Sequence, residues 1–263
     1  MKADTKTQTR SLSCGFLTCG IGLLALSTLP LQATVVYQDT FDNDGLATNT
    51  GIGGGLQEFN ATNGGATGLT VVDDGNLSTP STGHNNRGNF FSLNTFDLTG
   101  GFTLTAELDL LSGSALSGNS SRATFGLISD ATAPSRVGNI VQPDSIALSV
   151  FAQDADALQE GLIYEGTNID DTLIPDLTPG FQTISISVAA NGLDYTYSVD
   201  GLSESGTLAS AFDFTEEYYI VGAFQDAESF TVYESITLEV VPEPSSAALL
   251  GLGGLALILR RRK

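Results

Sequence analysis

The sequence contains few of the side chains that enzymes use for covalent or metal chemistry. Among 263 residues there are two cysteines, one histidine and no tryptophan. Both cysteines, Cys14 and Cys19, lie in an apolar segment near the N-terminus, so the rest of the chain offers no disulfide and no thiolate ligand. The single histidine, His84, lies in a polar stretch and cannot form a metal cluster alone. Beyond the N-terminal segment, thiol chemistry and histidine-rich metal sites are therefore excluded, and stability must come from packing.

Positive charge is equally scarce in the middle of the chain. Seven of the ten basic residues lie at the two ends, which leaves Arg87, Arg122 and Arg136 between residues 34 and 241. The same segment holds 28 of the 30 acidic residues, so its formal charge is 3 − 28 = −25, without a lysine. Such a surface repels nucleic acid and anionic membranes, and it suits an acidic or saline exterior, divalent cations or cationic partners. We therefore expect no nucleic-acid partner.

Residues 1–33 have the organisation of a secretory signal peptide. Three basic residues precede an apolar run over residues 12–29, Pro30 ends that run, and Ala33 offers a small residue at the cleavage position. An uncleaved membrane anchor is the alternative. The polar, aspartate-rich segment that follows Ala33 is typical of the start of a mature domain and favours cleavage. We expect a signal helix that signal peptidase removes.

Residues 34–240 predict strands rather than helices. In residues 102–110 the apolar side chains fall on every second position, which is the pattern of a half-buried strand. Further alternating or apolar runs occupy residues 123–128, 146–151, 183–188, 195–199, 218–222 and 235–240. About a dozen short strands in one segment of this length are typical of a single all-β domain, an antiparallel β-sandwich.

Two dipeptides predict tight hairpins within this domain. Asn191-Gly192 and Asp200-Gly201 each separate two strand-like runs. A two-residue hairpin needs both central residues at positive φ, which Asn, Asp and Gly tolerate best. We therefore expect a type I′ turn at each dipeptide.

The order of these motifs resembles the concanavalin A/laminin G-type jelly roll. The resemblance rests on a Phe-Asp-rich first strand at 36–42, the Gly-Gly-Phe-x-Leu-x-Ala strand at 100–106, the Phe-Gly strand at 123–128 and the hairpin at 195–201. It implies that the last strand, at 230–240, returns beside the first. These motifs concern structure, so they imply a fold and not an activity.

The C-terminal residues 241–263 form a separate signal. Pro242 and Pro244 favour an extended linker, the stretch from Ser245 to Leu259 is almost entirely apolar, and four cations end the chain: Arg260, Arg261, Arg262 and Lys263. A buried core helix is the alternative, but such a helix does not end in four cations. The stretch of about fifteen residues is shorter than the roughly twenty that span a bilayer comfortably. We expect a short transmembrane helix with its basic end inside the cell.

This arrangement, with Pro242, Glu243 and Pro244 ahead of the apolar run, resembles the PEP-CTERM sorting signal. The resemblance implies recognition by an exosortase, cleavage near the Pro-Glu-Pro motif and transfer to the cell envelope, surface or extracellular matrix. The protein would then be anchored in the inner membrane only until it is processed. Its partners during export would be signal peptidase and the exosortase.

A pair of acidic residues raises the question of catalysis. Several jelly rolls of the resembled fold are glycosidases with Glu-x-Asp-x-x-Glu or Glu-x-Asp-x-Glu on one strand, and Glu107 and Asp109 match the first two positions. The third position holds Leu111 or Ser112. Without the third carboxylate no acid protonates the leaving oxygen, so we expect no catalytic residues here and a solvated strand face instead.

Carbohydrate binding needs less than hydrolysis. Tyr164, Tyr218, Tyr219 and Phe90-Phe91 are candidate stacking platforms, although alternating strands use such residues for the core more often. Calcium is the one candidate cofactor: Asp39, Asp42 and Asp44 could form a site, as could Asp73-Asp74 with Asn76, but neither spacing matches an EF-hand.

Three functions remain open from the sequence. The leading hypothesis is a non-enzymatic surface or matrix protein that acts in adhesion or binds exopolysaccharide or other glycans. The second is a degenerate or unusual glycoside hydrolase that uses Glu107 and Asp109. The third is a structural matrix protein without a ligand.

Overall fold

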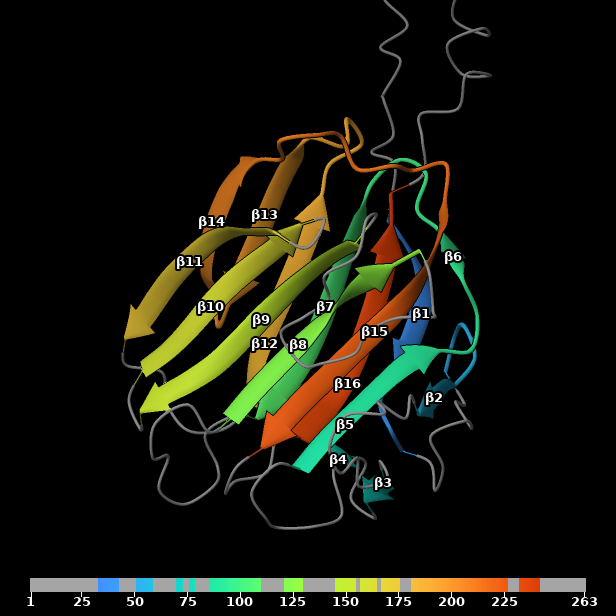
Figure 1. Cartoon of the computed structure of the whole chain (residues 1–263). Coiled ribbons are helices and arrows are strands. Elements are labelled where there is room, and N and C mark those ends of the chain that lie inside the picture. The colour runs from blue at the N-terminus through green and yellow to red at the C-terminus, as the bar shows by residue number, and fades with distance from the viewer. Residues whose placement is uncertain are drawn as a thin grey trace, which may run out of the picture. The chain divides into compact units, whose positions relative to one another are not determined.

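The computed structural model (Figure 1) describes eleven stretches of the chain. They are residues 33–42, 51–58, 70–72, 76–78, 86–109, 121–129, 145–154, 157–164, 167–175, 181–226 and 232–241. Their regular secondary structure is entirely β, which confirms the all-β prediction. Within these stretches no helix is long and apolar enough to cross a bilayer. The expected signal helix and C-terminal helix lie outside the described residues.

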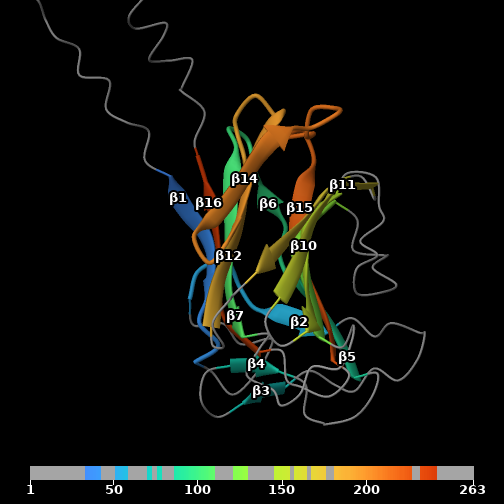
Figure 2. The same ribbon diagram turned by 90° about the vertical axis from the view of Figure 1, so that its left-hand side faces the viewer.

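The strands form two antiparallel sheets that lie face to face (Figure 2). Sheet A has the order β14-β13-β12-β7-β16-β4-β3, with β1 beside β16. Its strands are β14 (Leu202–Thr207), β13 (Asp194–Val199), β12 (Phe181–Val188), β7 (Phe102–Asp109), β16 (Val232–Val240), β4 (Asn76–Ser78), β3 (Thr70–Val72) and β1 (Thr34–Asp39). The predicted antiparallel sandwich is confirmed.

Sheet B has the order β11-β10-β9-β8-β15-β5-β2, with β6 beside β15. Its strands are β11 (Thr167–Pro175), β10 (Ala157–Tyr164), β9 (Ser145–Asp154), β8 (Ser121–Ile128), β15 (Glu217–Asp226), β5 (Asn86–Ser92), β2 (Leu56–Glu58) and β6 (Phe96–Asp97). Each of the seven strand-like runs predicted from periodicity falls largely or wholly within one of the strands of the two sheets.

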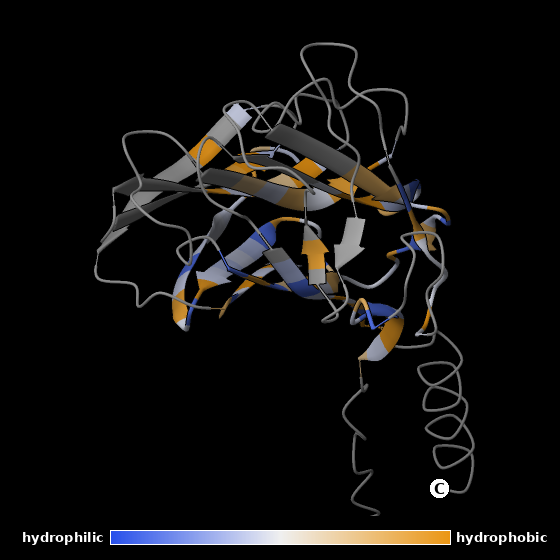
Figure 3. Cartoon of the chain, turned by 90° about the horizontal axis from the view of Figure 1, so that it is seen from below, coloured by the Kyte–Doolittle hydropathy of each residue, from blue (hydrophilic) through white to orange (hydrophobic). Residues whose placement is uncertain are grey.

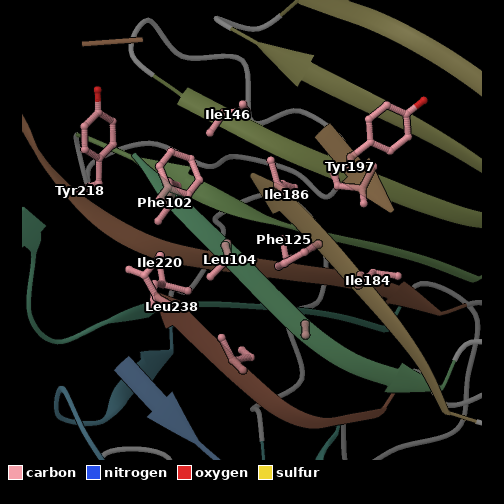
Figure 4. Close-up of a cluster of buried hydrophobic side chains, with 14 of the residues drawn as sticks. Phe102, Leu104, Phe125, Ile146, Ile184, Ile186, Tyr197, Tyr218, Ile220 and Leu238 are labelled. Atoms are coloured by element: carbon pink, nitrogen blue, oxygen red, sulfur yellow. The ribbon is translucent and has the colours of Figure 1, made fainter. Parts of the chain in front are cut away.

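The core lies between the sheets because the strands alternate as their sequences do. In β7 the side chains of Phe102, Leu104, Ala106 and Leu108 are buried against the other sheet. Figure 4 shows Phe102 and Leu104 among side chains from both sheets, and Figure 3 shows hydrophobic and hydrophilic residues alternating along the described strands. Polar side chains in the intervening positions are consequently left on the outer faces.

The two predicted hairpin turns differ. Asp200 and Gly201 have φ values of 48° and 82°, so the type I′ prediction is confirmed between β13 and β14. The hairpin predicted at Asn191-Gly192 is confirmed, because β12 and β13 pair antiparallel, but its type I′ turn is not. Strand β12 ends at Val188, the next strand begins at Asp194, and of the dipeptide only Gly192 has a positive φ. The Asn191 side chain instead accepts hydrogen bonds from the amides of Leu193 and Asp194, at 3.0 and 3.1 Å, and closes a longer loop.

The last strand lies beside the first, as the fold resemblance implies. Strands β1 and β16 are antiparallel, and Thr34 pairs with Val240. One residue later the Val241 amide donates to the Gly101 carbonyl at 3.0 Å. The chain therefore enters and leaves the described domain at the same end of one strand pair.

Candidate functional site

The acidic pair found in the sequence lies on the outer face of sheet A. Glu107 and Asp109 alternate with buried residues of β7 and share one side of the strand, as predicted. Across the sheet Glu107 pairs with Thr183 of β12 and Ser235 of β16. The Ser235 hydroxyl donates to Glu107 Oε2 at 3.3 Å. Asp109 is only 6 % exposed, although its strand position faces away from the core.

A third carboxylate comes from the neighbouring strand. The β7–β16 register shifts between Tyr233 and Ser235, so Glu234 is an extra residue beside the pair, and it is exposed. A bulge of this kind changes the direction of side chains locally. Sequence reasoning looked for the third carboxylate on the same strand, at Leu111 or Ser112, which lie outside the described residues. Strand pairing, which would have identified Glu234, is not readable from sequence periodicity.

An exposed phenylalanine lies next to this acidic pair. Phe181, the first residue of β12, pairs directly with Asp109 and is 45 % exposed. It belongs to the outer face together with Thr183 and Ser185. The sequence interpretation missed Phe181, although its alternation with Gln182 and Ile184 was a usable signal. Its ring offers an apolar surface beside a carboxylate.

The rest of this outer face consists mainly of hydroxyl side chains. We call this set the hydroxyl face: Thr103, Thr105, Thr183, Ser185, Ser187, Thr196, Ser198, Ser203, Ser205, Ser235 and Thr237. Hydrogen bonds join hydroxyls of adjacent strands: Thr103 with Ser187 at 2.9 Å, Ser185 with Ser198 at 2.7 Å, and Thr196 with Ser205 at 2.8 Å. The hydroxyl face therefore continues from β14 to β16.

A shallow hollow of about 260 Å³ lies at one end of the hydroxyl face. Thr103, Ser187 and Thr196 contribute hydroxyls to it, and Asp194 contributes a carboxylate. Apolar parts of Phe102, Val188, Ala189 and Val241 complete its lining. The Asn191 amide donates to Asp194 Oδ2 at 2.7 Å and thereby orients that carboxylate. Hydroxyls, a carboxylate and apolar atoms thus meet in one depression.

The predicted aromatic platforms divide between the core and sheet B. Tyr164, Tyr218 and Phe90 are buried, as the alternation favoured. Phe91 and Tyr219 are half-buried on the outer face of sheet B, where their rings form an edge-to-face pair with centroids 5.9 Å apart. Tyr219 also packs against a small buried cluster of Ile128, Ala147 and Val221. This aromatic pair is a second, smaller candidate surface.

The calcium candidates are described only in part. Asp39 is 3 % exposed and accepts hydrogen bonds from the Phe41 amide at 2.9 Å and the Tyr37 hydroxyl at 3.4 Å. Asp42 accepts a hydrogen bond from the Thr40 hydroxyl at 2.6 Å. In the described stretches no group of three His, Cys, Asp or Glu residues could hold a metal ion. Asp44, Asp73, Asp74 and His84 lie outside them, so calcium stays a prediction.

Burial raises the pKa of the Asp39 carboxyl above its usual value, against the opposing effect of the hydrogen bonds from Phe41 and Tyr37. Asp39 therefore favours folding most when it is protonated, and this contribution is lost as the pH rises from the usual aspartate pKa to the raised one. We expect Asp39→Asn to be more stable than the wild type at pH 7, with a difference that disappears below about pH 4. Urea unfolding at both pH values measures this.

The same variant tests calcium. If Asp39 binds calcium, the ion raises the unfolding midpoint of the wild type and leaves that of Asp39→Asn unchanged. If the wild type and Asp39→Asn differ in stability by the same amount at both pH values, ionisation of the buried Asp39 carboxyl is not the cause of the difference. The asparagine side chain retains an oxygen that accepts the hydrogen bond from the Phe41 amide. The turn at Phe41, where φ is 53°, is therefore preserved.

Comparison with known proteins gives separate findings for the C-terminal tail and for the β-sandwich. The model of the PEP-CTERM protein-sorting motif matches residues 240–263. No curated protein matches the chain. An endo-1,3-β-glucanase from Streptomyces sioyaensis is similar in structure, with a TM-score of 0.56, 16 % identity, and 80 % of this chain and 97 % of that chain covered.

Two carbohydrate-binding proteins are similar to the same degree. The winged bean acidic lectin, in complex with methyl-α-D-galactose, has a TM-score of 0.56 and 9 % identity, with 81 % of this chain and 100 % of that chain covered. The Emp47p carbohydrate recognition domain has a TM-score of 0.54 and 14 % identity over 79 % and 96 % of the two chains. At such identities the likeness establishes the fold alone. The chain thus ends in a PEP-CTERM protein-sorting motif, and its described part is a jelly roll of the concanavalin A-like kind.

Proposed function

We propose that this is an exported envelope or surface protein, processed by an exosortase, whose jelly roll binds carbohydrate without cleaving it. The sorting motif at residues 240–263 supports the destination. The similar structures include a lectin in complex with methyl-α-D-galactose and a carbohydrate recognition domain, and these support carbohydrate as the class of ligand. Adhesion to a glycan matrix is the role that joins the two.

The observation that carries the proposal is Phe181 beside Asp109 on the outer face of sheet A. A sugar ring has one apolar C–H surface and a rim of hydroxyls, so binding sites combine an aromatic ring with a few polar acceptors. Phe181 supplies the ring, and Asp109, which pairs with it directly across the strands, exposes 6 % of its surface. Glu107 and the hydroxyls of Thr183 and Ser235 follow in the next cross-strand position.

Binding fits this arrangement better than cleavage does. Glycoside hydrolysis needs one carboxyl group that holds a proton for the leaving oxygen and a second that is ionised. Glu107 accepts a hydrogen bond from the Ser235 hydroxyl at 3.3 Å, and the position of the third carboxylate on the same strand holds Leu111 or Ser112. The exposed Glu234 is the specific feature that favours the alternative, a glycoside hydrolase with an unusual third carboxylate.

A glycan array probed with residues 34–241, which contain every described strand, tests the proposal. We expect binding to a subset of glycans, and we expect Phe181→Ala to weaken it about tenfold, the effect of losing roughly 1.4 kcal/mol. Leu202→Ala, another truncation of an exposed apolar side chain, on β14, is the matched control and should bind normally. Arrays with and without calcium show whether the ion is needed.

Other outcomes identify the alternatives. Loss of binding in Tyr219→Ala but not in Phe181→Ala would move the site to sheet B. Release of reducing ends from a bound glycan, abolished in Glu107→Gln or Glu234→Gln, would identify a hydrolase. Absence of binding to every glycan in both conditions would favour a structural matrix protein.

A further inference from the structure

The hydroxyls on sheet A form ordered cross-strand rows. The strand register aligns Ser205, Thr196, Ser187 and Thr103 in one row, and Ser203, Ser198, Ser185, Thr105 and Thr237 in the next. Adjacent strands lie about 4.8 Å apart, so the second row crosses five strands and about 19 Å. All these side chains are exposed or half-buried. A row of this length exceeds the size of a single sugar.

The hydroxyls keep hydrogen-bonding capacity for a ligand. A Ser or Thr hydroxyl donates one hydrogen bond and accepts two. The bond between Ser185 and Ser198 uses one donor and one acceptor, and the same holds for Thr196 with Ser205. The remaining positions can both donate to and accept from the hydroxyls of a sugar, without the cost of desolvating a charge.

Charge decides which polymer fits. Residues 34–241 have a formal charge of −25. Glu239 continues the first row opposite Thr103, and Glu107 lies beside the second row, opposite Thr183 and Ser235, so the charges that the register brings here are acidic. A polysaccharide that carries carboxylate or sulfate groups would be repelled. A neutral polysaccharide meets no such barrier.

The hollow is a separate observation that lies along the first row. Its three hydroxyls, from Thr103, Ser187 and Thr196, belong to that row, and Asp194 adds a strong acceptor. Its volume of about 260 Å³ suits a ligand of one sugar ring rather than an oligomer. A chain with one ring in the hollow would continue over the hydroxyl face.

From this geometry we infer that the hydroxyl face binds an extended neutral polysaccharide, with one ring of the polymer in the hollow beside Asp194. The inference rests on the proposed carbohydrate binding and adds the ligand class and the path of the chain. It places the polymer across the strands of sheet A, in the hollow and over the hydroxyl rows beside it.

Binding to insoluble polymers tests this inference. Residues 34–241 are mixed with curdlan or microcrystalline cellulose, both neutral, and in parallel with cross-linked alginate, which is acidic, and the free protein is measured. We expect binding to a neutral polymer and none to alginate. Ser185→Glu and Thr196→Glu, which place a charge in the two rows, should each weaken binding about tenfold.

Ala209→Glu is the matched control, because it adds the same charge at an exposed position outside the rows. It should bind as the wild type does, and circular dichroism should be unchanged in all three variants. Unchanged polymer binding in Ser185→Glu and Thr196→Glu would overturn the inference, as would a preference for alginate. If glycan binding persists in that case and depends on Phe181, the proposed function stands. If no glycan or polymer is bound at all, both fail.

Discussion

Replacing Pro242, Glu243 and Pro244 by alanine is expected to leave the protein with its basic C-terminal tail attached and to reduce its amount on the cell surface. A loss of roughly 1.4 kcal/mol in binding to the exosortase already weakens this recognition about tenfold. Each proline lacks an amide donor and disfavours helix in the residue before it, so the sequence predicts an extended linker here. Alanines remove both restrictions and the glutamate that the motif places between them. Cell fractionation followed by intact-mass measurement of each fraction gives the result.

Ser245→Ala and Ser246→Ala are suitable controls because they lie directly after Pro242-Glu243-Pro244 and leave these three residues unchanged. Both variants should be processed and released normally. Released wild-type protein should lack Arg260, Arg261, Arg262 and Lys263. Finding these four residues on surface or extracellular material would contradict processing by an exosortase.

A second large effect is expected in the fold itself. Gly126 of β8 pairs with Ala147 of β9, and a Cβ atom added at Gly126 would lie 2.2 Å from the Ile146 carbonyl oxygen and 2.6 Å from the Ala147 Cβ. Because the nearest obstacle is backbone, the two strands must separate to make room. We expect Gly126→Ala to destabilise the domain by about 3 kcal/mol, the upper range of overpacking. Urea unfolding of residues 34–241 measures the difference.

Gly201→Ala separates this steric effect from the conformational freedom of glycine. Gly201 has a φ of 82°, and a Cβ there would contact nothing within 4 Å. Its substitution should therefore cost only the strain of a left-handed backbone, about 1 kcal/mol. Equal losses of unfolding free energy in the two variants would contradict the prediction that the close contact between β8 and β9 makes Gly126→Ala the more destabilising change.

The strands and the core were readable from the sequence because they depend on local alternation. The period of two in β7 identified both its buried side and the shared face of Glu107 and Asp109. The Asp200-Gly201 turn was equally local, since it depends on two residues that tolerate positive φ. At Asn191-Gly192 the hairpin was predicted correctly but its turn type was not, because the Asn191 side chain accepts hydrogen bonds from the following amides and stabilises a longer loop.

The candidate site depends on which strands are neighbours, and sequence periodicity does not contain that information. Phe181 and Asp109 are 72 positions apart by their residue numbers and meet only because β12 pairs with β7. Glu234 becomes relevant through a bulge opposite Glu107. The hydroxyl rows were visible as separate Ser and Thr alternations, but their alignment across five strands required the register.

The pairing of Thr34 with Val240 also has a mechanical consequence. Two adjacent antiparallel strands whose outer ends lie together, when pulled apart by those ends, lose their hydrogen bonds one after another. The load is then never shared along the whole ladder. A protein held at both ends would thus yield at low force, starting from the bonds of Thr34. Held by one end alone, the two strands are not pulled apart by their outer ends.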